Sequence, residues 1–336
     1  MGVSVIIGGQ WGSEGKGKTT YFFSKQLNAS SVVRVGGSNS GHTVIDDRGQ
    51  KRIFQILPVA SILDGVTCIL PAGSYIDLDI LQREITQSGI SDSNLKINKN
   101  AIIITDDCKA EEKKAYLNES IGSTESGTSA AVNARIYRSG NTVRAEHIKT
   151  LEKYLCDTND FLRKELDKKK EIIIEGTQGF GLSLLHSPDY PYTTSRDTSA
   201  AGFLSESGLS PFDVINIIMV LRTFPIRVAG NSGPLPDELT WEDVNRLANS
   251  STPIIEYTTV TKRIRRVARF NHAIVHEAIT ANKPNIIVLN HCDYFDASIY
   301  NQLYLSEIAE NEVKRIEKTI GKVDYIGTGD RTLFKR

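Results

Sequence analysis

The chain has 336 residues, 40% of them hydrophobic, and carries 40 Lys and Arg against 40 Asp and Glu. This size and apolar content suffice for one large core or two coupled lobes. Zero net charge argues against nucleic acid or an anionic membrane as partner, because phosphate backbones are bound by clustered Lys and Arg. The four cysteines are scattered without a C-x-x-C pair, so neither a zinc site nor a disulfide framework is indicated.

Nothing in the sequence predicts export or membrane insertion. No apolar run reaches the length of a membrane-spanning helix. The chain begins directly in a predicted strand, which leaves no room for a signal peptide. We therefore expect a cytoplasmic enzyme.

Unbroken runs of Ile and Val predict strands that are covered on both faces, and hence a mainly parallel central sheet with flanking helices. In chain order, the predicted strands are 3–7, 31–35, 67–70, 101–105, 171–175, 214–221 and 285–290. The predicted helices are 19–27, 79–88, 147–170 and 266–281. Because no internal repeat or low-complexity linker interrupts the chain, residues 1–336 are interpreted as a single α/β domain.

The first predicted strand leads into GGQWGSEGKGKTT, residues 8–20. Its part from Gly12 to Thr19 fits the phosphate-binding pattern G-x-x-x-x-G-K-[ST]. The glycines allow backbone N–H groups to point at an anion, and the start of the following helix attracts the same anion. We therefore expect this loop to bind nucleotide phosphates. A glycine-rich turn without a ligand is the alternative, and a complete match between a strand and a helix argues against it.

Polar segments also follow later strands, at the edge where parallel sheets carry their sites. Residues 36–43 read GGSNSGHT, and residues 175–179 read EGTQG, with YPYTTS at 190–195. Residues 256–266, EYTTVTKRIRR, form a basic cluster in an otherwise neutral protein. A solvated helix start is the alternative interpretation of that cluster, and a lone histidine such as His42 is more often structural than catalytic.

Taken together, these segments resemble the adenylosuccinate synthetase family, ligases that join aspartate to a purine nucleotide. The opening loop is similar to the family's GTQWGDEGKGK, and residues 36–43 are similar to its GGHNAGHT. Further segments match family motifs in the same order. Ser123-Thr124 and Arg138 match STGRG and a later arginine, residues 175–179 match EGAQG, and residues 190–195 match YPYVTS. Residues 261–266 match TTGRRRR, residues 290–296 match LTKLDVLD, and residues 327–329 match a terminal base-binding turn. The resemblance covers nearly the whole chain.

The resemblance implies a P-loop-like adenylosuccinate synthetase fold and chemistry in two steps. The γ-phosphoryl group of a nucleoside triphosphate moves to the purine O6, and the amine of L-aspartate then displaces phosphate at C6. It also implies Mg²⁺ as cofactor and a homodimer in which Arg138 is shared across the interface.

Site residues follow from the same matches. The implied catalytic residues are Ser13, Lys16 and His42. The phosphates of the triphosphate would be bound by Gly12, Glu14, Gly15, Gly17, Lys18, Thr19, Gly41 and Thr43. The nucleoside monophosphate would be held by Ser13, Asn39, Thr124, Arg138, Gln178, Thr194 and Arg263, and aspartate by Thr261, Arg263 and Arg265. The base of the triphosphate would contact Arg265, His291, Asp293, Gly327 and Gly329, while Mg²⁺ would bind Ser13 and Gly41.

One departure from the family concerns the acceptor nucleotide. Cellular members carry an aspartate where this chain has Ser13, and use it to remove the N1 proton and to help bind magnesium. A serine hydroxyl is too weakly basic for that role. A viral branch of the family couples aspartate to dGMP instead of IMP, and has a small residue at this position. Guanine carries an amino group on C2, next to N1, and a short hydroxyl side chain leaves room to hydrogen-bond it.

We therefore predict dGMP as the acceptor and 2-amino-2'-deoxy-N6-succinyladenylate as the product. This reaction would be a step towards 2-aminoadenine nucleotides for phage DNA, in the host cytoplasm. The chain is also shorter than the cellular enzymes, which agrees with the viral branch.

Other departures concern the energy donor. Asp293 retains the carboxylate that reads guanine in cellular members, but His291 and Asn290 replace a lysine and a threonine. Asp330 follows the terminal turn where the family has proline. These changes favour ATP as donor, with dATP and GTP as alternatives. The basic segment also departs from the family, with Val260, Lys262 and Ile264 in place of Thr, Gly and Arg.

Three alternative functions remain open. The chain could be an ordinary adenylosuccinate synthetase that uses IMP and GTP, a P-loop switch that hydrolyses nucleotide, or a binding protein that has lost its base. A switch leaves Arg263, Arg265 and Thr194 unexplained. The retained Lys16 and His42 argue against an inactive protein.

Overall fold

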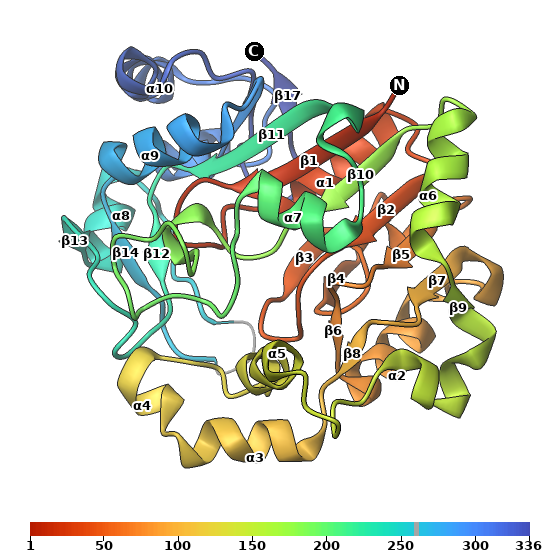
Figure 1. The fold of residues 1–336 in the computed structure, drawn as a ribbon. Coiled ribbons are helices and arrows are strands. Elements are labelled where there is room, and N and C mark those ends of the chain that lie inside the picture. Colours follow the sequence, from red (N-terminus) through yellow and green to blue (C-terminus); the bar gives the residue numbers. More distant parts are fainter. Residues whose placement is uncertain (259–261) are drawn as a thin grey trace.

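A computed structural model describes residues 1–258 and 262–336. Its centre is a large sheet (Figure 1). From one edge to the other, the described strands of this sheet are β17 (Phe334–Lys335), β16 (Tyr325–Ile326), β15 (Ile286–Asn290), β11 (Val214–Arg222), β1 (Val3–Gly8), β10 (Ile172–Glu175), β2 (Ser31–Arg34), β5 (Thr67–Leu70), β7 (Leu95–Asn98) and β9 (Leu155–Cys156). Neighbouring strands pair in parallel except at the β16–β17 edge. The predicted mainly parallel sheet is confirmed.

Helices lie on both faces of the sheet. The described α-helices are α1 (Lys16–Gln26), α2 (Leu78–Ser88), α3 (Asp106–Lys114), α4 (Leu117–Ile121), α5 (Thr128–Tyr137), α6 (Thr158–Asp167), α7 (Ala200–Ser207), α8 (Trp241–Leu247), α9 (His272–Asn282) and α10 (Glu307–Ile320). Strand β1 shows how the faces separate. Val5 packs in a core cluster with Phe203 of α7, whereas Ile6 packs with Phe23 of α1. Alternate residues of a strand point to opposite faces, so both faces of β1 need apolar cover.

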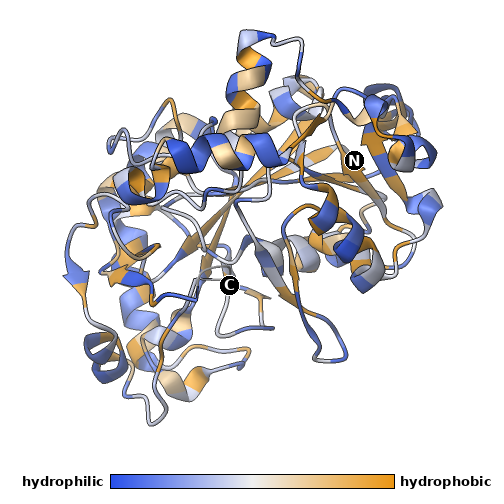
Figure 2. Cartoon of the chain, turned by 90° about the horizontal axis from the view of Figure 1, so that it is seen from below, coloured by the Kyte–Doolittle hydropathy of each residue, from blue (hydrophilic) through white to orange (hydrophobic). Residues whose placement is uncertain are grey.

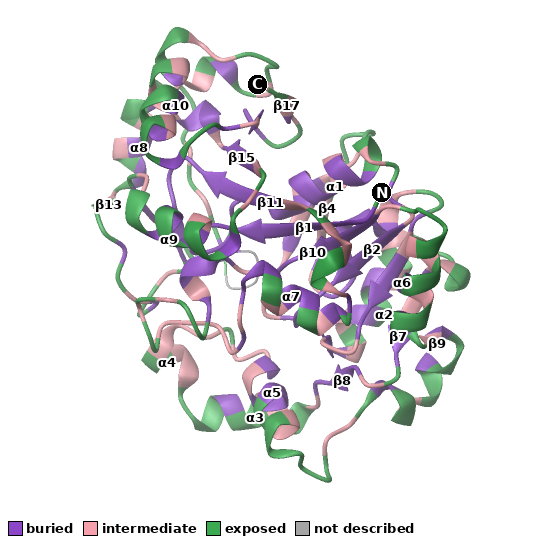
Figure 3. Cartoon of the chain, turned by 45° about the horizontal axis from the view of Figure 1, so that its top comes forward, coloured by how far each residue is buried: buried purple, intermediate pink, exposed green. Residues whose placement is uncertain are grey.

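Smaller sheets stand beside the central one. They pair β3 (His42–Ile45) with β4 (Lys51–Phe54), β6 (Tyr75–Ile76) with β8 (Ile102–Ile103), and β14 (Arg266–Ala268) with β12 (Ile226–Arg227) and β13 (Glu238–Leu239). In Figure 2 the central strands are hydrophobic and the outer helices are largely hydrophilic, and Figure 3 shows that the same strands are buried. No helix among the described residues has the length and apolar content needed to cross a membrane.

Two predicted helices are wrong at their N-terminal ends. The first half of 147–170 forms the 3₁₀ helix Lys149–Tyr154 and strand β9, and α6 begins only after Asp157, whose carboxylate accepts hydrogen bonds from the backbone of Asn159 and Asp160. In the segment 266–281, the first residues form β14, and α9 begins after Asn271, which caps it. In both segments a side-chain cap sets the start of the helix.

The predicted strand 101–105 is also shorter than expected. Only Ile102 and Ile103 form a strand, β8, and it pairs with β6 outside the central sheet. These apolar residues are buried here, and they would also be buried in a strand of the central sheet. Their composition therefore does not distinguish a strand of the central sheet from a short strand beside it.

Candidate functional site

A cleft of about 310 Å³ opens at the carboxyl edge of the central sheet. It is lined by the loop after β1, by residues after β2 and β10, and by the segment 226–232 after β11. The basic segment 256–266 contributes Glu256, Thr258, Arg263 and Arg265. These segments are far apart in the sequence, and the parallel order of the strands brings their ends together.

Most of the site residues predicted from the sequence line this cleft. They are Gly12, Ser13, Gly15, Lys16, Gly17, Lys18, Asn39, Gly41, His42, Thr43, Thr124, Gln178, Arg263, Arg265, His291 and Gly329. Thr194 lies against the same wall, because its hydroxyl accepts a hydrogen bond from the Asn39 amide at 3.4 Å.

A few predicted site residues do not line the cleft with their side chains. The side chains of Glu14 and Thr19 are fully buried and turned into the protein. Asp293 is buried beneath the cleft, and Gly327 contacts Lys18 and Asn290 rather than the open space. Arg138 is exposed at the end of α5. Thr261 lies outside the described residues.

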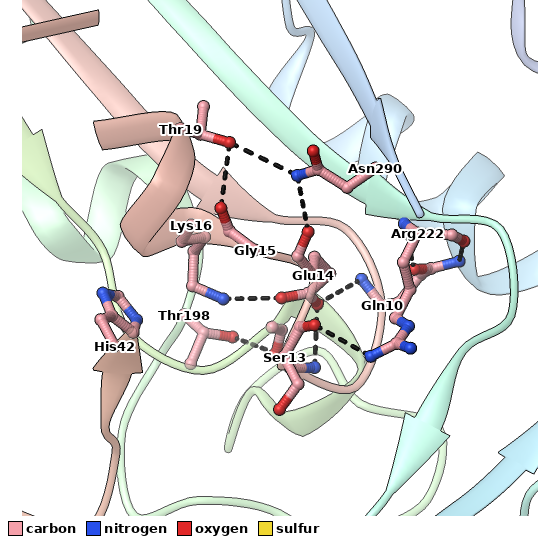
Figure 4. Close-up of polar contacts among 12 residues, drawn as sticks. Gln10, Ser13, Glu14, Gly15, Lys16, Thr19, His42, Thr198, Arg222 and Asn290 are labelled. Atoms are coloured by element: carbon pink, nitrogen blue, oxygen red, sulfur yellow. Dashed lines mark hydrogen bonds and ion pairs between the residues drawn. The ribbon is translucent and has the colours of Figure 1, made fainter. Parts of the chain in front are cut away.

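The phosphate loop is organised by the Glu14 carboxylate, as Figure 4 shows. This group accepts backbone hydrogen bonds from Gln10 at 3.2 Å and Gly12 at 2.8 Å, and it pairs with Lys16 Nζ at 2.6 Å. The Thr19 hydroxyl donates to the Gly15 carbonyl. Consequently, Glu14 and Thr19 shape the loop from behind, and only their backbone is free to contact phosphate. That Glu14 and Thr19 bind the phosphates of the triphosphate stays a prediction, and in this geometry their backbone N–H groups would make the contact.

Lys18 lies at one end of the cleft. Its ammonium donates to the Gly329 carbonyl at 2.7 Å, next to Asp293 and Asp330. Burial lowers the pKa of Lys18 to about 8. Burial also raises the pKa of Asp293 to about 6, against the attraction of Lys18, and its Oδ1 has no hydrogen-bond partner among the described residues. This end of the cleft therefore combines a buried carboxylate with a buried cation.

His42 stands on β3 between two buried charges. Its Nδ1 contacts both Arg34 and the Glu175 carboxylate, which is 2.5 Å away, and Glu175 also accepts the backbone N–H of Val59 at 3.0 Å. Arg34 and Glu175 are register partners on the adjacent strands β2 and β10. Because Nδ1 is occupied, it is the Nε2 edge of His42 that remains available to the cleft.

Electrostatics keep this histidine neutral. Burial lowers the pKa of His42 to about 3, and the charge of Arg34 acts in the same direction. Burial acts to raise the pKa of Glu175, but Arg34 and His42 hold it below its usual range. The cleft therefore faces a neutral imidazole with a fixed orientation.

Ser13 contacts two arginines from distant segments. Its hydroxyl accepts a hydrogen bond from Arg265 Nη1 at 2.5 Å, and its carbonyl accepts one from Arg222 Nη1 at 3.1 Å. Arg222 is fully buried at the end of β11 and forms an ion pair with Glu256. The residue that departs from the family thus lies where the phosphate loop meets the basic segment.

The sequence interpretation missed several charged residues of the site, namely Arg34, Glu175, Arg222, Arg227 and Glu256. Each stands at the end of a strand or at the start of a segment that the sequence analysis singled out. Arg227, for example, lines the cleft, pairs with Asp189 and stacks 5.2 Å over the ring of Trp11. The feature of the sequence that could have identified such residues is a charged residue at the carboxyl end of an apolar strand.

Comparisons with known proteins agree with this geometry. Residues 5–148 and 143–300 match the family model described as adenylosuccinate synthetase. The adenylosuccinate synthetase of Methanocaldococcus jannaschii is 34% identical over 97% of this chain and 94% of its own length. That of Methanococcus maripaludis strain C5 is 32% identical over 98% of this chain and 97% of its own length.

The chain belongs to the adenylosuccinate synthetase family. It is therefore a carbon–nitrogen ligase, and this membership decides between a ligase and a P-loop switch. The expectation that its length sets it apart from cellular enzymes is wrong, because it spans nearly the whole of these archaeal synthetases.

Two solved structures of synthetases share the fold. Cyanophage S-2L succinoaminodeoxyadenylate synthetase (PurZ), bound to dGMP and to dATP as an energy donor, superposes with a TM-score of 0.83 at 28% identity, over 99% of this chain and 95% of that one. Plasmodium falciparum adenylosuccinate synthetase superposes with a TM-score of 0.86 at 20% identity, over 100% of both chains. The predicted adenylosuccinate synthetase fold is confirmed.

The buried neutral His42 predicts a pH dependence of stability in this synthetase. An unfolded histidine titrates near pH 6.5, whereas the pKa of folded His42 is about 3. Between these values only the unfolded chain binds the proton, so the free energy of unfolding falls as the pH drops below about 6.5, by up to about 1.4 kcal/mol per pH unit. The His42→Asn variant lacks this histidine, so its free energy of unfolding should lack this pH dependence.

Urea unfolding of both proteins, at about pH 7.5 and about pH 5, measures this difference. All other titratable groups are shared and cancel in the comparison, except Glu175, which contacts His42 directly. Wild-type protein and His42→Asn losing equal stability over this interval would contradict a buried neutral histidine.

Proposed function

We propose that this synthetase couples L-aspartate to C6 of dGMP at the expense of ATP, giving 2-amino-2'-deoxy-N6-succinyladenylate, ADP and phosphate. The observation that carries the proposal is Ser13, whose short side chain lines the cleft beside Arg265. An aspartate in this place would have a longer side chain and would crowd the 2-amino group of guanine, which is next to N1. A hydroxyl is smaller and can accept a hydrogen bond from that amino group.

The other cleft residues fit the two steps of such a ligation. Lys16 would stabilise the charge that develops while the phosphoryl group moves to O6, and the Nε2 edge of His42 would face the same groups. Arg263 and Arg265 offer planar guanidinium groups for the carboxylates of aspartate. Asn39, Thr124, Gln178 and Thr194 would hold the monophosphate and its base. Proton removal from N1 is left to water or to a group other than Ser13.

The cyanophage structure supports both nucleotide assignments. That enzyme is bound to dGMP and uses dATP as its energy donor. In the present chain, Lys18, His291, Asp293, Gly327 and Gly329 gather at one end of the cleft or beneath it, and they would receive the base of the donor. ATP or dATP is the donor that we propose, with GTP as the alternative.

The archaeal relatives support a second candidate, an ordinary synthetase that acts on IMP with GTP. Their names are those of adenylosuccinate synthetases, and their similarity extends over almost the whole chain. Asp293, buried next to Lys18, suits guanine as the donor base, because a carboxylate accepts two hydrogen bonds from the N1–H and 2-amino groups.

Magnesium is proposed as the cofactor. No group of three His, Cys, Asp or Glu side chains in the described part of the chain could hold a metal ion. The Ser13 hydroxyl and the Gly41 carbonyl are oxygen donors on the cleft wall, and Mg²⁺ is commonly held by one or two protein oxygens together with substrate phosphates. Ser13 and Gly41 thus fit the ion once nucleotides are bound, when it would neutralise phosphate charge.

A shared active site is proposed as well. Arg138 is exposed at the end of α5, beside Tyr137, whose side chain is 74% exposed. The cleft of the same chain does not include Arg138. An exposed arginine next to exposed apolar residues is suited to reach the monophosphate in a second copy of the chain, within a twofold dimer.

The acceptor and the donor can be identified together. Enzyme, magnesium and aspartate are incubated with dGMP, GMP or IMP, each in turn with ATP, dATP or GTP, and the products are identified by mass. We expect the highest kcat/KM with dGMP and an adenine donor. Equal or greater turnover of IMP would favour the ordinary synthetase instead.

Exchange of the serine tests its role directly. Ser13→Asp should lower the ratio of kcat/KM for dGMP to that for IMP, because the carboxylate suits hypoxanthine and crowds the 2-amino group. The left-handed backbone at this position, with φ 58°, is one that aspartate tolerates, so the variant should fold. Ser13→Ala is the control for loss of the hydroxyl alone. A ratio that stays constant, or moves towards dGMP, would exclude Ser13 as the discriminator.

Mixing two inactive chains tests the shared site. Each heterodimer of Arg138→Ala and Lys16→Ala chains contains one site in which both residues are intact. After subunit exchange of equal amounts, we expect activity to recover to about a quarter of the wild-type value, because half of the dimers are mixed and each has one working site. If exchange is demonstrated by a mass-tagged chain and activity does not recover, Arg138 does not act across an interface.

A further inference from the structure

The phosphate loop and the basic segment are joined through one buried arginine. Arg222 lies at the end of β11 with none of its surface exposed. One side of its guanidinium donates to the Ser13 carbonyl at 3.1 Å, and the group also binds both carboxylate oxygens of Glu256. Figure 4 shows Arg222 reaching the loop beside Ser13 and Gln10.

Ser13 needs such support because of its backbone conformation. Its φ of 58° is in the left-handed region, which is unfavourable for a residue with a side chain. The hydrogen bond from Arg222 holds the carbonyl of this strained residue. Arg222 is fixed in turn, because the Gln10 side chain binds its backbone N–H at 2.9 Å and its carbonyl at 3.1 Å.

Glu256 links the same arginine to the residues that follow. Its carboxylate also accepts a hydrogen bond from the Tyr294 hydroxyl at 2.9 Å, and its carbonyl accepts the backbone N–H of Arg265 at 2.9 Å. Arg265 then returns to the loop, where its guanidinium donates to the Ser13 hydroxyl. The contacts form a closed circuit from Ser13 through Arg222, Glu256 and Arg265 back to Ser13.

The ion pair at the centre of this circuit is well compensated. Its geometry is bidentate, and the Arg222 guanidinium also lies 5.9 Å from the centre of the Tyr294 ring. Although burial acts to raise the pKa of Glu256, Arg222 holds it well below its usual range, so the carboxylate is ionised throughout the working pH range. A bidentate Arg–carboxylate contact fixes direction as well as distance.

We propose that Arg222 and Glu256 are positioning residues that set the placement of Arg265 relative to Ser13, and so couple the choice of acceptor base to the binding of aspartate. This proposal rests on the proposed function, which assigns Ser13 to the acceptor and Arg265 to aspartate. Neither Arg222 nor Glu256 acts on the reacting atoms. Their effect is transmitted through the two residues at the ends of the circuit.

Glu256→Gln tests the proposal, because it keeps the shape of the side chain and removes its charge. Misplacement of Arg265 should raise the KM for aspartate roughly tenfold or more, and shift the ratio of kcat/KM for dGMP and IMP, while the KM for ATP changes less than about twofold. Asp213→Asn is the matched control, since Asp213 forms a bidentate pair with Arg163 that lies outside the cleft. The control should leave all three quantities unchanged.

A double-mutant cycle separates positioning from direct contact. If Glu256 acts through Arg265, then Glu256→Gln should add little to the aspartate KM in an Arg265→Ala background. Effects that multiply would overturn the proposal, as would an unchanged aspartate KM in the single variant. The KM values for aspartate and ATP are measured with whichever acceptor the wild-type enzyme prefers, so failure of the dGMP assignment shows first in the wild type and not in the variants.

Loss of the charge from a buried pair could also prevent folding. Tyr294→Phe provides the second variant, because it removes one hydrogen bond from Glu256 and leaves both charges in place. It should raise the aspartate KM in the same direction by a few fold. A folded Tyr294→Phe enzyme with wild-type kinetics, together with an unfolded Glu256→Gln chain, would also overturn the proposal.

Discussion

The floor of the cleft depends on the pairing of buried charges. Lys16 with Glu14, Arg34 with Glu175, and Arg222 with Glu256 are ion pairs in which at least one partner is fully buried. Removing a single partner from such a pair costs roughly 3–5 kcal/mol, because the other charge stays buried without compensation. These pairs constrain the surrounding backbone, and the geometry of the site follows from them.

Two of these pairs, Arg34 with Glu175 and Arg222 with Glu256, join segments that are far apart in the chain. Arg34 and Glu175 are opposite each other on adjacent parallel strands, so the sheet itself aligns the two charges that orient His42. The Lys16–Glu14 pair closes the phosphate loop on itself, and Glu14 also gathers the N–H groups of Gln10 and Gly12. A site that must bind several anionic groups is thereby held in shape before any ligand arrives.

The same arrangement explains why a change as small as Ser13 is informative. The surrounding loop is held by Glu14 and Arg222, so the side chain at position 13 can change without a change in the loop. Under the proposed function, the choice between guanine and hypoxanthine would depend on the volume of the side chain at this one point of the cleft. Membership of the family establishes that the enzyme is a carbon–nitrogen ligase. The serine at position 13 is the reason to propose guanine as the acceptor base.

Local signals in the sequence predicted the mainly parallel sheet and the phosphate loop, and the resemblance to the family supplied most residues of the cleft. Apolar runs predict buried strands wherever they occur, and glycine-rich turns after strands have few other uses. The tertiary structure alone decided which side chains face the cleft. Glu14 and Thr19 belong to the phosphate-loop pattern, yet their side chains are buried behind the loop, because a fold must satisfy the polar groups of its own turn. Arg222 and Glu256 are 34 residues apart, and no local pattern relates them. Their pairing exists because β11 ends, and the basic segment begins, at the same edge of the sheet.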